Sequence, residues 1–119
     1  MKRGFDRTQR VADLIQKTLA QLLLQVAEDD FRLVTVTGVE MSRDLSYAKV
    51  YVTVLADDEK KIKQIIKSLN QNAKALRYQL AQRVKLRIAP ELKFVYDEST
   101  ARGFRISTLI DSAMKKSEK

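Results

Sequence analysis

The chain contains no cysteine and no histidine, and this closes several kinds of chemistry to it. Without cysteine it has no disulfide, no thiolate nucleophile and no cysteine-ligated zinc, and without histidine it lacks the commonest general base and metal ligand. Its three glycines, Gly4, Gly38 and Gly103, lie far apart, so they do not form a glycine-rich phosphate loop. We therefore expect a protein that is not an enzyme, with no catalytic residue, no cofactor and no metal site.

Long apolar runs are missing as well. No run approaches the roughly 20 residues that cross a bilayer, and the first residues carry no apolar signal region. We expect a cytoplasmic protein, and 119 residues suit one hydrophobic core. The expected domain covers residues 1–110, followed by a frayed basic tail over 111–119.

Acidic residues are absent from residues 60–90. This stretch holds nine lysines and arginines and no carboxylate, whereas the whole chain carries a net charge of +8. Positive charge is thus concentrated in one segment, and its partner classes are nucleic acid, an anionic membrane or an acidic protein. The same stretch is predicted to be helical and to contribute to the core, because its apolar residues recur three or four apart, at Ile62, Ile65, Ile66, Leu69, Ala73, Leu76, Leu80 and Val84.

The segments before this stretch predict one helix and a hairpin. Helical spacing runs through Val11, Leu14, Ile15, Leu19, Leu22, Leu23 and Val26, and Asp6 with Gln9 resembles a capping box at the start. Two strand-like segments, residues 33–41 and 46–55, flank a polar turn from Ser42 to Ser46. In the second of them, core residues are predicted to alternate with exposed ones, with Ala48, Val50, Val52 and Val54 on the core face.

Polar residues mark the boundaries in the second half of the chain. Asp57 and Asp58 are predicted to cap the helix that follows them. The weak helix formers Ser68, Asn70 and Asn72 predict a kink or break in its middle, and a third strand is predicted over 92–96, after Pro90. The predicted fold is α+β, with a small sheet covered on one face by helices.

Three segments resemble the bacterial ribosome-binding factor A family. They are RVA at residues 10–12, VTGVEMSRDLSYAKVYVTVL at 36–55 and LRIAPELKFVYDES at 86–99. The resemblance implies a single KH-like domain of type II, with the order α-β-β-α-kink-α-β, a three-stranded sheet and its helices packed on one face. In this family the kink typically carries Ala-x-Gly, and the corresponding residues here are Asn72, Ala73 and Lys74. The glycine, which most easily adopts a positive φ, is therefore replaced by a lysine.

The resemblance also implies a function. Proteins of this family are non-enzymatic factors that bind the precursor 30S ribosomal subunit and its 16S rRNA during late maturation, assist processing of the rRNA 5′ end and act in the cold. For this chain it implies a monomer that binds neither a membrane nor a small-molecule substrate. Electrostatic docking onto structured RNA fits the cations of the chain. The predicted RNA-binding residues form one patch of Lys74, Arg77, Arg83, Lys85 and Arg87, a second of Arg7, Arg10 and Lys17, and Arg43 at the hairpin turn.

Other interpretations stay open at this point. In the main alternative, the basic stretch is an amphipathic module that binds an acidic protein or an anionic membrane. Tyr78 is the only aromatic residue in the stretch that could anchor it in a membrane interface. In a second alternative, Arg77 and Arg83 have a structural role and cover apolar surface with the aliphatic part of their side chains. Tyr47 and Tyr51, which flank Lys49 on the exposed face of a strand, are either base-stacking residues or ordinary strand residues.

Overall fold

The structure is a computed structural model that describes residues 2–26, 29–85 and 89–99. Its elements follow in the order α1 (Lys2–Gln25), η1 (Asp29–Leu33), β1 (Val34–Met41), β2 (Tyr47–Val54), α2 (Glu59–Gln71), α3 (Ala73–Arg83) and β3 (Glu91–Tyr96). This order confirms the α+β arrangement predicted from the sequence. The predicted tail, residues 111–119, lies outside the described residues.

The three strands form one mixed sheet in the order β1-β2-β3. β1 pairs with β2 antiparallel, as the hairpin prediction requires, whereas β3 pairs with β2 in parallel. A parallel neighbour needs a crossover connection, and the two helices α2 and α3 supply it. The register of β1 against β2 shifts between Val36 and Gly38, so Thr37 forms a bulge that the sequence analysis did not predict.

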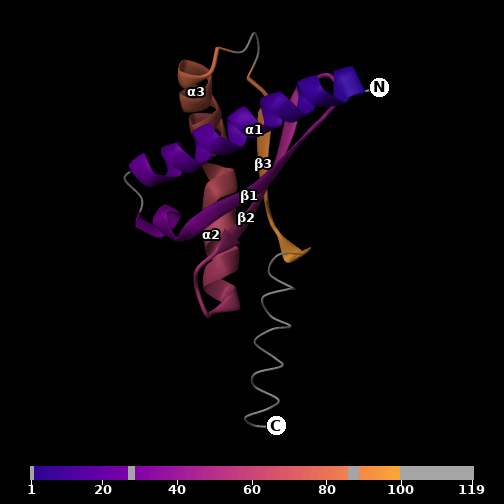
Figure 1. Cartoon of the computed structure of the whole chain (residues 1–119). Helices are drawn as coiled ribbons and strands as arrows, with labels where there is room; N and C mark the ends of the chain where they lie inside the picture. The colour runs from indigo at the N-terminus through magenta and orange to yellow at the C-terminus, as the bar shows by residue number, and fades with distance from the viewer. Residues whose placement is uncertain (1, 27–28, 86–88, 100–119) are drawn as a thin grey trace.

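One face of the sheet forms the core. The predicted core face of β2 is confirmed, because Ala48, Val50, Val52 and Val54 are buried, whereas the residues between them are half-buried rather than exposed. The core side of the sheet packs against apolar residues from all three α-helices, among them Ile15, Leu19, Ile65, Leu69, Leu76 and Leu80. α1 lies across β1 and α3 (Figure 1). The helices therefore cover a single face, as predicted.

Two predicted helix starts have different outcomes. The side chain of Asp58 accepts a hydrogen bond from the Lys60 backbone N–H at 3.0 Å, which confirms the predicted cap of α2. The predicted capping box of α1 is wrong, because that helix begins at Lys2 and Asp6 lies inside it. The Gln9 amide donates instead to Asp13, one turn further along the same helix, at 2.8 Å. Gln9 therefore makes an i,i+4 hydrogen bond within α1 and does not cap the helix.

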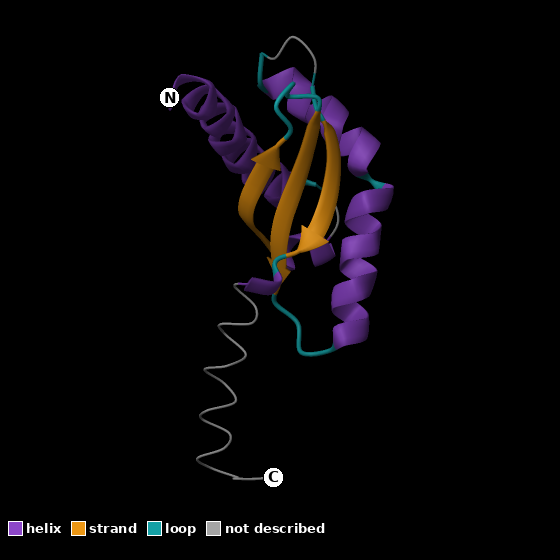
Figure 2. Ribbon diagram, turned by 90° about the vertical axis from the view of Figure 1, so that its right-hand side faces the viewer, coloured by secondary structure: helices purple, strands orange, loops and turns teal. Residues whose placement is uncertain are grey.

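The long basic segment is two helices, with Asn72 between them (Figure 2). Asn72 has φ −97° and ψ 8°, and its side-chain amide donates to the Ser68 carbonyl at 2.8 Å. The break therefore needs no residue with positive φ, and Lys74 takes an ordinary helical position in α3. The missing glycine does not prevent the bend, because an asparagine in the bridge region between the α and β regions ends one helix and lets the next begin.

Asn70, just before the break, has a different role. Its side-chain amide donates to the Phe94 carbonyl at 2.9 Å and accepts from the Phe94 N–H at 2.8 Å. It thus occupies backbone groups on the outer edge of β3, which would otherwise offer a site for another strand. Asn70 is a weak helix former, but its side chain supplies hydrogen-bond partners to the edge strand of the sheet.

Candidate nucleic-acid interface

Lys74 and Lys85 are the predicted cations at the two ends of α3. Both side chains are exposed, and neither has a salt-bridge partner among the residues that the structure describes. No carboxylate interrupts the surface of α3, whose sequence is AKALRYQLAQR. Both ammonium groups are therefore available to a polyanion.

Arg77 is held by the protein itself. Its Nε and Nη2 both donate to the Ala89 carbonyl, at 3.0 and 2.8 Å, and the residue is half-buried. The guanidinium thereby fixes the chain just before Pro90 and the start of β3. The structural interpretation of this arginine fits its contacts better than RNA binding does.

Arg83 also makes an internal contact, although it is exposed. Its Nη2 donates to the side-chain oxygen of Gln25 and so joins the end of α3 to the end of α1. Arg87, the last member of the predicted patch, lies outside the described residues. Of the predicted patch, only Lys74 and Lys85 are thus described with free, exposed charges.

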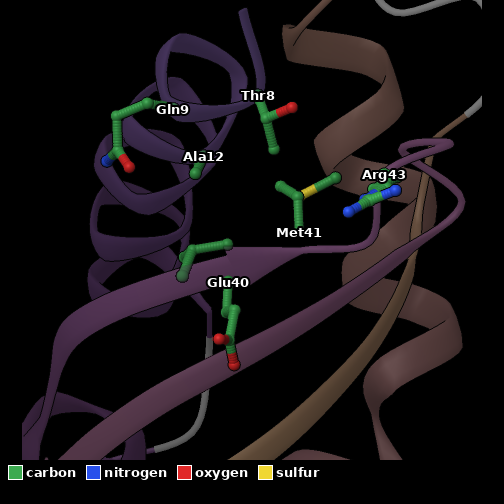
Figure 3. Close-up of a pocket in the computed structure, with 7 residues that line it drawn as sticks. Thr8, Gln9, Ala12, Glu40, Met41 and Arg43 are labelled. Atoms are coloured by element: carbon green, nitrogen blue, oxygen red, sulfur yellow. The ribbon is translucent and has the colours of Figure 1, made fainter. Parts of the chain in front are cut away.

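The predicted α1 cations, Arg7, Arg10 and Lys17, are all exposed along one helix. Arg43 lies beside the same helix, where it lines a hollow of about 670 Å³ together with residues from the first turns of α1. Figure 3 shows this hollow between α1 and the end of β1. Its lining combines apolar and polar side chains: Thr8, Gln9, Ala12, Val39, Glu40, Met41 and Arg43. Sequence alone did not show that the hairpin turn lies beside the start of α1.

The turn that carries Arg43 is fixed by the neighbouring Asp44. One oxygen of its carboxylate accepts from the Ser46 hydroxyl at 2.7 Å, the Ser42 hydroxyl at 2.8 Å and the Ser46 N–H at 3.1 Å. These hydrogen bonds, the Ser46 hydroxyl first, lower the pKa of Asp44 from 3.8 to about 2. Leu45 adopts φ 62°, the left-handed conformation that closes the turn. Arg43 is therefore presented on an ordered support.

The hairpin turn that carries Arg43 contacts the start of β3. The Glu91 N–H donates to the Ser46 carbonyl at 2.9 Å, which places the hairpin turn next to the segment that Arg77 holds. The hairpin turn and the start of β3 lie at the same end of the molecule as the N-terminus of α1 (Figure 1). Lys74 is at the far end of α3 from them, at the break with α2.

The tyrosines of β2 are only half-buried, and one of them is occupied. The Tyr51 hydroxyl donates to Glu40 at 3.0 Å, and the Lys49 ammonium lies 5.8 Å from the centre of the Tyr51 ring. The first is a diagonal contact between β1 and β2, and the second joins two residues of β2 on the open face of the sheet. Tyr78 on α3 differs from them, since its side chain is 66% exposed. Tyr78 was not among the predicted RNA-binding residues, although its spacing from Leu76 and Leu80 already placed it opposite the core.

The described residues include no metal-binding cluster. No group of three or more acidic side chains there is arranged to hold a metal ion. None of the helices in residues 2–26, 29–85 and 89–99 is long and apolar enough to cross a membrane.

Comparison with known proteins identifies the family. The family model of ribosome-binding factor A matches residues 7–110. The chain belongs to this family. It is 48% identical over 117 residues to ribosome-binding factor A of Nitrosomonas europaea, covering 98% of this chain and 99% of the relative. The corresponding protein of Pseudomonas fluorescens is 47% identical over 116 residues, covering 96% of this chain and 87% of the relative.

Solved structures of ribosome-binding factor A share the fold. The crystal structure of the Thermus thermophilus protein matches with a TM-score of 0.65 and 26% identity, over 75% of this chain and 94% of that one. A homology model of the Thermus thermophilus factor, fitted into a cryo-EM map of a 30S complex, matches with a TM-score of 0.60 and 27% identity. That match covers 71% of this chain and 89% of the other.

Proposed function

We propose that this chain is a non-enzymatic assembly factor that binds the precursor 30S ribosomal subunit and its 16S rRNA. Its work is late maturation of the subunit, including processing of the rRNA 5′ end, with its greatest importance in the cold. It acts in the cytoplasm as a monomer. The observation that carries the proposal is membership of a family with a member fitted into a 30S complex.

The exposed cations support an electrostatic mode of binding. Lys74 and Lys85 are exposed at the two ends of α3. Arg7, Arg10 and Lys17 are exposed on α1, and Arg43 lines the hollow beside that helix. Such side chains neutralise phosphates and release condensed counterions, so affinity falls as salt rises. Structured RNA is recognised largely by shape and backbone contacts, which a rigid α+β domain with ordered cations can provide.

Co-sedimentation with small ribosomal subunits tests the proposal. We expect the chain to sediment with immature subunits at low salt and to be released as the salt concentration rises. The variant Lys74→Glu/Lys85→Glu should lose this association. Its matched control is Lys60→Glu/Lys63→Glu, which reverses two exposed cations at the start of α2 and changes the net charge equally.

The outcomes separate the alternatives. Binding that is indifferent to salt would contradict the electrostatic mode. Equal losses in both double variants would mean that net charge, rather than the α3 surface, governs association. Recovery of the chain with an acidic protein and not with subunits would support the alternative partner class.

A further inference from the structure

Tyr78 is an exposed aromatic residue on a helix that otherwise presents small, polar and basic side chains to solvent. Its side chain is 66% exposed, a larger exposed fraction than any other described aromatic residue has. It lies two residues from each of the buried residues Leu76 and Leu80, which places it on the opposite side of α3. The core therefore does not account for this ring.

The surroundings of Tyr78 leave its ring open. One turn away on the same face are Lys74 and Ala75 on the N-terminal side, and Ala81 and Gln82 on the C-terminal side. A helical side chain leans toward the N-terminus, so the ring lies over Lys74 and Ala75. The two alanines are too small to cover an aromatic face.

The charge around the ring suits one kind of ligand. Lys74 is exposed, α3 carries no carboxylate, and Lys85 follows the helix with its charge also exposed. An exposed aromatic ring on a helix with lysines and no carboxylates suits an unpaired base stacked on the ring, with its phosphate on an ammonium group. The two tyrosines of β2 lack this setting, since they are half-buried and Tyr51 is bonded to Glu40.

We propose that Tyr78 is a stacking platform for one unpaired base of the bound RNA, with Lys74 holding an adjacent phosphate. This inference rests on the proposed RNA binding and adds a contact to it that depends on the base. Electrostatic binding alone would not distinguish a strand with bases from one without them, whereas stacking requires the base.

Two oligomers of about 12 nucleotides test the proposal, one an oligodeoxyadenylate and the other an abasic strand of equal length. The wild-type chain is expected to bind the adenylate about tenfold more tightly than the abasic strand. Tyr78→Ala should abolish this preference and leave affinity for the abasic strand unchanged, while Tyr78→Phe retains the preference. Lys74→Ala should weaken binding to both strands.

A fluorescent variant gives a second, independent readout. The chain contains no tryptophan, so Tyr78→Trp introduces a single indole, whose emission should be quenched by the adenylate and not by the abasic strand. Leu55→Trp is the control, because Leu55 is 80% exposed and lies in the link between β2 and α2. Its emission should stay unchanged with either strand.

The outcomes are distinct. If Tyr78→Ala keeps the preference for the adenylate, the stacking proposal is overturned while electrostatic RNA binding stands. If Tyr78→Ala reduces subunit association but leaves the preference intact, the ring contacts a ribosomal protein and stacking is likewise overturned. If the wild-type chain binds neither oligomer nor subunits, the proposed function itself fails.

Discussion

The side chain of Asn70 pairs with Phe94 as a neighbouring strand would, donating to its carbonyl and accepting from its N–H. Replacing Asn70 with alanine leaves both backbone groups without this partner, although alanine is the better helix former. We expect a loss of about 1–2 kcal/mol in the free energy of unfolding, measured by denaturant titration. The control is Gln71→Ala, next to it on α2 and also exposed, whose effect should stay within about 0.5 kcal/mol. Equal stability of the two variants would contradict this role of Asn70.

The Arg77 guanidinium should matter more for stability than for RNA binding. Arg77→Ala removes both hydrogen bonds to the Ala89 carbonyl and should lower the free energy of unfolding by about 1–2 kcal/mol. Arg77→Lys should recover only part of this loss, because an ammonium group lacks the planar fork. Lys74→Ala, on the same helix, should leave the unfolding transition nearly unchanged. The opposite ranking would assign Arg77 to the ligand rather than to the fold.

The cations of α1 and of the hairpin turn should contribute to the salt dependence of binding. Arg10→Gln/Arg43→Gln removes two exposed charges, one on α1 and one at the hairpin turn. If each contacts one phosphate, the slope of log K against log salt becomes less negative by about 2. Filter binding of 16S rRNA at several salt concentrations measures this slope. The control Lys60→Gln/Lys63→Gln should leave the slope as it is in the wild-type chain, and a change of equal size there would remove the assignment.

The carboxyl group of Asp44 should titrate well below its ordinary range. Its pKa is lowered to about 2, so the folded state prefers the ionised group, and the contribution of the turn is complete above the ordinary value of 3.8. This contribution is lost as pH falls from 3.8 toward 2 and is constant at neutral pH. An NMR titration of the carboxyl carbon measures the midpoint directly. Ser46→Ala, which removes the largest cause of the shift, should move the midpoint upward, and a midpoint near 3.8 in the wild-type chain would contradict the hydrogen bonding seen in the turn.

Much of the fold follows from local patterns. The strict alternation in β2, the apolar stripes of the helices and the cap at Asp58 depend on neighbouring residues, so the sequence analysis located them correctly. It missed η1 and the bulge at Thr37, and it began α1 too late. A bulge depends on the pairing with another strand, and Thr37 in fact donates a hydrogen bond to the distant Asp97. Such features are set by partners that a local pattern does not contain.

Composition and spacing along single segments were enough to establish where positive charge gathers and where the long helical segment breaks, while three sequence motifs carried the family resemblance. Which cations are free depended instead on how the segments pack together. Arg77 and Lys74 look alike in the sequence, yet one is bonded to the Ala89 carbonyl while the other faces solvent. Packing likewise brought Arg43 beside the start of α1 and left the ring of Tyr78 uncovered by any other element that the structure describes. These relations join residues that are distant in the chain or depend on what covers a helix, so no local pattern contains them.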